Sequence, residues 1–244
     1  MDPRDASAPV LLASNLVKAH GTGRGARRIL DGASLHARAG ELVAIVGRSG
    51  SGKSTLLQIL GGLDRPDDGW VEVAGERVTG ASERRLSALR RHRIGFVFQF
   101  FHLLPELDGL ANVLLPATLP GADRAAPARG MELVERLGLS DVAHLAPHQL
   151  SGGEQQRFAL ARALVADPPL ILADEPIGNL DAASGQTVLR LLRDAADQGR
   201  AVVMVTHQAE ATAVADRVLR LDDGRVTELQ PGGGEPLETA HDAP

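Results

Sequence analysis

The sequence contains no cysteine and no tyrosine, and it has one tryptophan and five phenylalanines in 244 residues. Without cysteine the chain cannot form a disulfide, a cysteine-ligated zinc site, an iron–sulfur cluster or a thiol nucleophile. Without tyrosine, an aromatic contact to any ligand must come from another residue type. The formal net charge of −5 also disfavours a protein that binds nucleic acid non-specifically through its phosphate backbone.

Long apolar runs are also absent. A membrane-spanning helix needs about 18 or more consecutive apolar residues, whereas the longest runs here, 42–46 and 170–173, have the length of β-strands. Residues 1–5 carry two acids and a proline and lead into no apolar stretch, which is unlike a secretory signal. We therefore expect a cytoplasmic protein with no direct membrane insertion.

Short apolar segments alternate with helical patterns along most of the chain. The expected strands are 42–46, 94–98, 170–174, 202–205 and 217–221, and the expected helices are 53–61, 131–137, 151–166, 182–196 and 208–215. Such alternation is typical of an α/β protein with a mainly parallel sheet. The proline-rich stretch from about 100 to 160 interrupts it and predicts a helical insert. Residues 1–9 and 228–244 are polar or rich in glycine and proline and are expected to be disordered, which leaves one domain at 10–227.

The first motif that carries chemistry lies between an expected strand and an expected helix. It reads Gly47-Arg48-Ser49-Gly50-Ser51-Gly52-Lys53-Ser54-Thr55 and matches G-x-x-x-x-G-K-[ST], the P-loop pattern. The glycines let successive backbone N–H groups face a phosphate at the positive end of the helix. Lys53 would reach the β- and γ-phosphates of a nucleoside triphosphate, and the hydroxyl of Ser54 would bind Mg²⁺.

The second motif is a pair of acids, Asp174 and Glu175, directly after the apolar run 170–173. Ligands of open α/β sheets bind at the carboxyl ends of the strands, which is where this pair would emerge. Asp174 would hold Mg²⁺, and Glu175 would orient or deprotonate the attacking water.

The third motif is the run Leu150-Ser151-Gly152-Gly153-Glu154-Gln155-Gln156-Arg157. Ser151 and Glu154 have the spacing of a capping box that opens a helix. Each of the two glycines in the first turn costs the helix about 1 kcal/mol, which is reasonable if an anion must approach the backbone there. The chain would then have a second helix start that faces a phosphate.

Together these motifs resemble the nucleotide-binding subunit of ATP-binding-cassette (ABC) transporters, and the likeness runs from about Val10 to Val226. The third motif is similar to the family's signature motif. Gln99 corresponds to the Q-loop, Asn179-Leu180-Asp181 to the D-loop and His207 to the switch histidine. The resemblance implies a P-loop NTPase with a RecA-like core, an N-terminal antiparallel β portion and a helical subdomain at about 100–160.

The resemblance also implies a dimer in which two subunits enclose two ATP molecules. Ser151 and Gly153, with Gly152 between them, would contact the γ-phosphate held by the other subunit, and Asp181 would join the two sites across the interface. ATP and Mg²⁺ are thus the expected cofactors, and a homodimer is the expected assembly.

Within each site the resemblance assigns further roles. Gln99 would sense Mg²⁺ and the attacking water, so that Ser54, Gln99 and Asp174 form the expected metal set. His207 would contact the γ-phosphate and act in catalysis with Glu175 and Gln99. A hydrogen-bond donor preorganised in this way typically raises the reaction rate by a factor of about 10²–10³.

Two positions depart from the usual pattern. The family commonly stacks adenine on an aromatic residue, most often tyrosine, and this chain has His20 at the matching place. The alternative for His20 is a solvated loop position. Ile177 replaces the threonine that is usual in the D-loop of the subgroup described next, and the sequence gives no physical reason for that exchange.

The runs 93–105 and 174–181 resemble ATPases of the macrolide-exporter and lipoprotein-release type. Phe96 and Phe98 alternate with Val97 and are expected in a core strand. Phe100 and Phe101 follow that strand and are expected near the groove that receives a permease's coupling helix. The basic cluster Arg84, Arg85, Arg90, Arg91, His92 and Arg93 is interpreted as a solvated helix face, with an anionic lipid or a partner as the alternative.

We therefore expect an ATPase subunit that powers a separately encoded permease in export or lipoprotein release and that the permease holds at the inner face of the cell membrane. The first alternative is an ABC-type ATPase that regulates a non-transport membrane partner such as a cell-division complex. The second is a nucleic-acid or assembly ATPase of the same superfamily. Such ATPases usually carry two cassettes, a long coiled coil or a zinc insert, none of which is found in this sequence, and no nucleic acid is expected as a partner.

Overall fold

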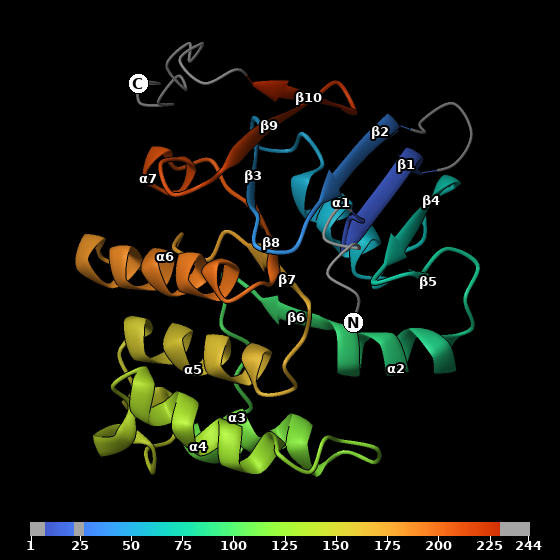
Figure 1. Ribbon diagram of the computed structural model, residues 1–244. Coiled ribbons are helices and arrows are strands. Elements are labelled where there is room, and N and C mark those ends of the chain that lie inside the picture. The colour runs from blue at the N-terminus through green and yellow to red at the C-terminus, as the bar shows by residue number, and fades with distance from the viewer. Residues whose placement is uncertain (1–7, 22–26, 230–244) are drawn as a thin grey trace.

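The computed structural model describes residues 8–21 and 27–229. A six-stranded sheet with the order β10-β9-β3-β8-β7-β6 forms its centre (Figure 1). Its strands are β3 (Leu42–Val46), β6 (Ile94–Val97), β7 (Leu170–Asp174), β8 (Ala201–Val205), β9 (Arg217–Asp222) and β10 (Arg225–Leu229). All pairs from β9 to β6 are parallel, and β10 joins the edge antiparallel to β9. The predicted α/β fold with a mainly parallel sheet is confirmed.

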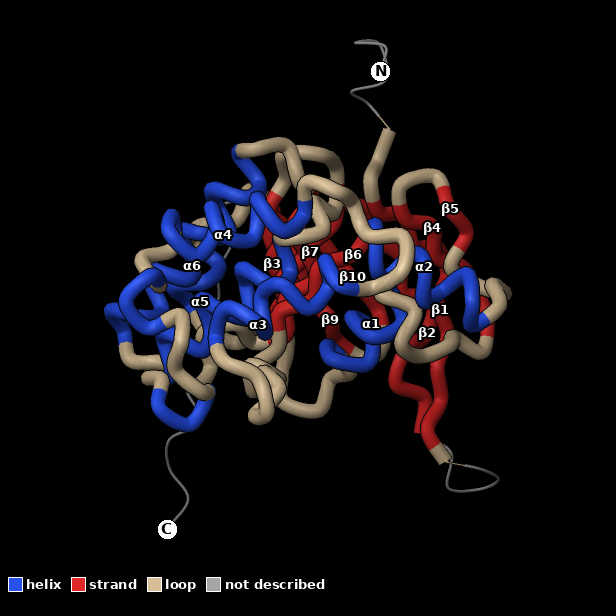
Figure 2. The backbone as a smooth tube through the Cα atoms, turned by 90° about the horizontal axis from the view of Figure 1, so that it is seen from below, coloured by secondary structure: helices blue, strands red, loops and turns tan. Residues whose placement is uncertain are grey.

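A second sheet is antiparallel and has the order β2-β1-β4-β5. Its strands are β1 (Leu11–His20), β2 (Arg27–Ala37), β4 (Asp68–Val73) and β5 (Glu76–Arg77). They lie to one side of the central sheet, and the helices α3 to α6 lie to the other (Figure 2). This sheet is the antiparallel portion that the family resemblance implied.

The inner strands β3 and β8 are apolar throughout because both faces of the sheet are covered there. In β3, Leu42 and Ala44 face a core that includes residues of α3 (Gly109–Leu114), α4 (Ala126–Arg136), α5 (Gly152–Leu164) and α6 (Ala182–Asp197). Val43 and Ile45 face a second core, formed with α1 (Lys53–Leu60) and the antiparallel sheet. The helices α1 and α5 therefore lie on opposite faces of the central sheet.

The segment between β6 and β7 contains no strand and consists of helices and turns. The short turns are η3 (Leu115–Thr118), η4 (Ser140–Val142) and η5 (Pro147–Gln149). Asp108 begins α3 because its side chain accepts a hydrogen bond of 2.7 Å from the N–H of Ala111. The helix α5 begins inside the range 100–160 and continues to Leu164, packing against α3, α4, α6 and β6.

Some elements differ from the sequence expectations. The helix α2 (Glu83–Arg93) carries the basic cluster, which agrees with its interpretation as a helix face, but no bounds were predicted for this helix because only Leu86 and Leu89 of α2 are buried. The helix α7 (Ala209–Thr212) is shorter than the expected range 208–215. Glu228 and Leu229, expected in the tail, belong to β10.

Residues 1–7 and 230–244, most of the two expected disordered ends, lie outside the described residues. No helix within 8–21 and 27–229 is long and apolar enough to cross a membrane.

Candidate functional site

The P-loop lies between the end of β3 and the start of α1, as the sequence predicts. The ammonium Nζ of Lys53 donates to the carbonyl oxygens of Gly47 at 2.8 Å and Arg48 at 3.1 Å. Gly50 and Gly52 have φ of 74° and 99°, which favour glycine. The loop therefore curls around Lys53, whose side chain is buried.

Several observations at this loop fit an anion. No side chain caps the start of α1, so its first N–H groups remain as donors at the positive end of the helix. The hydroxyl of Ser51 is buried and has no hydrogen-bond partner among the described residues. A Cβ on Gly47 would lie 2.5 Å from the carbonyl oxygen of Leu221, so only glycine fits there. Ser49 and Ser54 are exposed, and Thr55 is half-buried.

Asp174, at the end of β7, faces the P-loop. Its Oδ1 accepts a hydrogen bond of 3.1 Å from the hydroxyl of Ser54. Burial raises the pKa of Asp174, the charge of Glu175 adds to the rise, and the Ser54 hydroxyl and Lys53 oppose it. A hydroxyl and a carboxylate oxygen in contact are ligands that suit Mg²⁺, so Ser54 and Asp174 fit the predicted metal set.

Glu175 follows Asp174 with a positive φ of 44°, a backbone conformation that is costly for a non-glycine residue. Its Oε1 lies 2.9 Å from Nδ1 of His207, which follows β8. Its other oxygen, Oε2, is buried and has no hydrogen-bond partner within the described part of the chain. Two of the predicted catalytic residues thus form a carboxylate–imidazole pair with one acceptor left over.

Gln99, the third predicted catalytic residue, follows β6 and contacts the loop between β7 and α6. Its Nε2 donates to Oδ1 of Asn179 at 3.3 Å, and Nδ2 of Asn179 donates to the carbonyl oxygen of Gln99 at 3.2 Å. The D-loop prediction included Asn179 but no contact for it, because a pairing of residues 80 positions apart has no local signal in the sequence.

The second predicted phosphate-facing helix start is formed as a capping box. The Ser151 hydroxyl accepts from the N–H of Glu154 at 3.3 Å, and the Glu154 carboxylate accepts from the N–H of Ser151 at 2.8 Å. The hydrogen bonds from the hydroxyl and the N–H of Ser151 lower the pKa of Glu154. A Cβ on Gly153 would lie 2.5 Å from Oγ of Ser184 in α6, whereas a Cβ on Gly152 would have ordinary contacts.

The D-loop leads from β7 into α6 and lies against the start of α5 at Gly152, where an added Cβ would be 3.5 Å from Cδ2 of Leu180. Asp181 caps α6 by accepting from the N–H of Ser184 at 2.9 Å and from its hydroxyl at 2.7 Å, and these bonds lower the pKa of Asp181. Ile177 is 6% exposed and lies against Gly185, where an added Cβ would be 3.6 Å from the Cβ of Ile177. The structure thus gives Ile177 a packing role that the sequence did not reveal.

His20 is the last residue of β1 and is exposed. It pairs with Arg27 of β2. Two residues further along β2, Ile29 lies against Gly52, where an added Cβ would be 2.5 Å from Cγ2 of Ile29. The end of the β1–β2 pair that carries His20 is therefore beside the P-loop.

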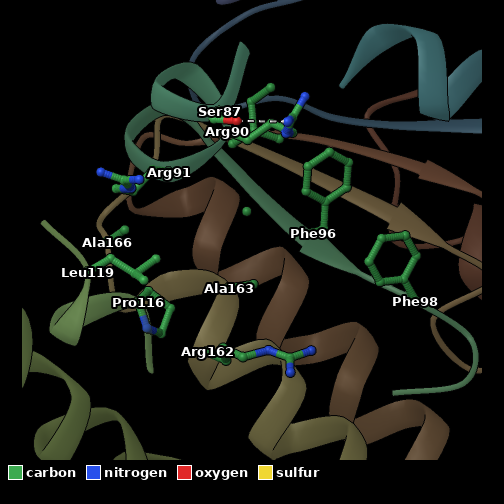
Figure 3. A pocket seen from close by; sticks show the side chains of 12 residues that line it. Ser87, Arg90, Arg91, Phe96, Phe98, Pro116, Leu119, Arg162, Ala163 and Ala166 are labelled. Carbon is green, nitrogen blue, oxygen red and sulfur yellow. Dashed lines mark hydrogen bonds between the residues drawn. The ribbon is translucent and has the colours of Figure 1, made fainter. Parts of the chain in front are cut away.

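A groove of about 440 Å³ lies between α2, β6, η3 and α5 (Figure 3). Phe96 and Phe98 line it and stack with ring centroids 5.6 Å apart. The expectation of a core strand for these two rings is thus only partly correct, because both are half-buried. Phe100 follows Phe98 by two positions in the chain. It does not line the groove, and its side chain is 70% exposed.

Arg162 of α5 also lines this groove and was not singled out from the sequence. Its guanidinium donates to the carbonyl oxygens of His102 at 2.6 Å and Phe101 at 2.9 Å. Phe101 and His102 both have positive φ, 55° and 50°. Arg162 therefore holds the strained turn that follows Gln99 against the helical layer.

Residues 30–178 match the protein family described as ABC transporter. The chain is 48% identical over 232 residues to the lipoprotein-releasing system ATP-binding protein LolD of Bordetella pertussis, an alignment that covers 94% of this chain and 99% of that protein. It is 46% identical over 218 residues to the macrolide export ATP-binding/permease protein MacB of Bartonella henselae, covering 89% of this chain and 33% of MacB. The chain thus spans about a third of the length of MacB.

A solved structure with a similar fold is a dimer of the ATP-binding cassette MJ0796 in a post-hydrolysis state bound to ADP and Pi. The TM-score is 0.80 at 37% sequence identity, and the match covers 91% of this chain and 99% of that one. A second dimeric structure of MJ0796 has a TM-score of 0.81.

Proposed function

The chain belongs to the ABC transporter family, and from this premise we propose that two copies close around ATP, hydrolyse it and power a separate membrane permease. The observation that carries the proposal is the presence of two anion-compatible helix starts in one chain. One starts α1, the other starts α5, and the two helices lie on opposite faces of the central sheet. A second copy of the chain would bring the α5 start of one subunit to the P-loop of the other.

In the ATP site, the P-loop would bind the triphosphate through its backbone N–H groups and Lys53. Ser54, Asp174 and Gln99 would hold Mg²⁺, which supplies charge neutralisation for the phosphates when bound. The free Oε2 of Glu175 would accept a proton from the attacking water, while His207 holds Oε1. Ser151 and Gly153 of the second subunit would complete the site.

A direct experiment on the purified chain tests this function. The chain is mixed with MgATP, phosphate release is measured, and the assembly state is followed by size-exclusion chromatography with light scattering. We expect hydrolysis whose rate per subunit rises with protein concentration, because a monomer holds no complete site. A rate per subunit that stays constant down to concentrations where only monomer is present would contradict the proposal.

His20 is proposed to stack on adenine, because the end of β1 lies beside the P-loop. Base–aromatic stacking is worth about 1–3 kcal/mol, and an imidazole offers less surface than a phenol. We expect His20→Ala to weaken ATP binding several-fold and His20→Tyr to strengthen it, as measured by calorimetry without hydrolysis. Unchanged affinity in both variants would place His20 in solvent instead.

The permease is proposed to dock on the groove lined by Phe96, Phe98 and Arg162 and to hold the chain at the inner face of the membrane. LolD, which the chain matches over almost its full length, is named as the ATP-binding protein of a lipoprotein-releasing system, and MacB as an ATP-binding/permease protein. A lipoprotein-release or export partner is therefore proposed for this chain.

Phe100 provides the test of docking, because its ring is 70% exposed and it follows the groove residue Phe98 by two positions in the chain. An exposed aromatic ring is suited to anchor an interface. We expect Phe100→Ala to reduce co-purification with a co-expressed permease, with a loss of about 2 kcal/mol, or about 30-fold in affinity. The variant should keep the ATP affinity and thermal stability of the parent. Met131→Ala, at an exposed apolar residue of α4 that does not line the groove, is the matched control and should co-purify as the parent does. Full co-purification of Phe100→Ala would remove Phe100 from the interface.

A further inference from the structure

Asn179 makes two hydrogen bonds to Gln99, and together they determine how both side-chain amides are oriented. Its Nδ2 donates to the backbone carbonyl of Gln99 at 3.2 Å, and its Oδ1 accepts from Nε2 of Gln99 at 3.3 Å. A backbone carbonyl can only accept a hydrogen bond. The amide of Asn179 must therefore present its nitrogen to the main chain of Gln99 and its oxygen to the side chain of Gln99.

This arrangement determines which atom of Gln99 remains available. An amide side chain can turn over, and its orientation is fixed by the hydrogen bonds that it makes. Because the oxygen of Asn179 can only accept, the side chain of Gln99 must present Nε2 to it. The Oε1 of Gln99 is then the atom left for another partner, and an oxygen is the atom that a hard cation or the proton of a water requires.

Gly178 gives Gln99 the space for this orientation. A Cβ at position 178 would lie 2.9 Å from Nε2 and 3.2 Å from Cδ of Gln99. Any larger residue would push the amide of Gln99 from its place against Asn179. The backbone φ of Gly178 is not positive, so an alanine can adopt the same backbone conformation. The effect of an alanine at this position would therefore come from the steric contact of its Cβ with the amide of Gln99.

We propose that Asn179 is a positioning residue that fixes the side-chain amide of Gln99 with its oxygen free for the cation and the attacking water of the ATP site. The proposal rests on the proposed ATPase function and on the role of Gln99 in it. Asn179 acts only through Gln99 and touches no reacting atom. Without Asn179, the side chain of Gln99 can turn its Nε2 toward the cation. The cation repels the partly positive N–H groups, so it loses a ligand.

The test measures hydrolysis by the purified chain at fixed ATP and increasing MgCl₂. We expect Asn179→Leu to lower kcat about tenfold, the usual size for a residue that orients a metal ligand, and to raise the Mg²⁺ concentration for half-maximal activity. Gly178→Ala, which removes no hydrogen-bonding group, should give the same pattern. ATP affinity without Mg²⁺ and the thermal melting temperature should not change. Gln186→Leu makes a similar exchange at an exposed position of α6 and is the matched control.

A double variant separates positioning from a general structural role. If Asn179 acts through Gln99, Asn179→Leu should cause no further loss in a Gln99→Ala background. Additive losses, or an unchanged Mg²⁺ requirement in Asn179→Leu, would overturn the inference and leave the proposed function intact. If Gln99→Ala itself hydrolyses ATP normally with a normal Mg²⁺ requirement, both the inference and the proposed role of Gln99 fail.

Discussion

Replacing Glu175 by Gln is expected to lower ATP hydrolysis about 100-fold or more, because a positioned general base contributes about 10²–10⁴ in rate. An amide cannot accept the proton of the attacking water at the position of Oε2, the buried carboxylate oxygen without a partner. The amide oxygen can still accept from Nδ1 of His207, so the pairing of these two residues at 2.9 Å need not break. The substitution therefore removes the base with little change of shape.

The same variant is expected to accumulate as an ATP-bound dimer. Hydrolysis would normally open the dimer, and the loss of one negative charge beside the γ-phosphate also favours the bound state. Light scattering with MgATP should show a dimer for Glu175→Gln and a return to monomer when ATP is removed. Glu132→Gln, an equal exchange at an exposed position of α4, should behave as the parent does. A monomeric Glu175→Gln variant with ATP bound would contradict the proposed assembly.

The inner strands β3, β7 and β8 of the central sheet could be predicted because they are short apolar runs with no polar alternation. In β3, successive residues enter two different cores, so every position must be apolar. The strands β1 and β2 have no such signal. Their pairing shifts register at several points, for example between Ala13 and Leu16, and only some of their residues are buried. An antiparallel portion was expected only from the family resemblance.

In the candidate site, too, features that depend on a local sequence pattern could be predicted and long-range contacts could not. The P-loop and the capping box of Ser151 depend on neighbours within a few residues, so pattern and spacing were sufficient. The bonds between Gln99 and Asn179, and those from Arg162 to the turn at Phe101, join segments about 60 to 80 residues apart. Which atoms meet there depends on the packing of α5 and the D-loop against β6. No local pattern in the sequence encodes that packing.

The proposed exchange of residues between subunits predicts that two inactive variants restore activity when mixed. Lys53→Ala removes the ammonium group that would bind the phosphates, and we expect hydrolysis to fall about 100-fold or more. Ser151→Asp is chosen because aspartate, like serine, can accept the N–H of Glu154 and begin α5. The variant loses the hydrogen bond from the Ser151 hydroxyl to the Glu154 carboxylate, so circular dichroism should first confirm that α5 is still folded. Its carboxylate would repel the γ-phosphate, and a comparable loss is expected. A dimer of either variant alone has two identical defective sites.

In a mixed dimer, one site combines both defects and the other site has neither. The intact site pairs the P-loop of the Ser151→Asp subunit with the helix start of the Lys53→Ala subunit. If the subunits combine at random, half of the dimers are mixed, so an equal mixture should recover about a quarter of the parent rate. Lys53→Ala mixed with the double variant Lys53→Ala/Ser151→Asp is the matched control and should stay inactive, since no subunit then has an intact P-loop. A mixture of the two single variants that stays inactive, although dimers form, would place Ser151 and Lys53 in the same subunit's site. Recovery would require that the α5 start acts on the ATP of the other subunit, because neither variant chain holds both groups.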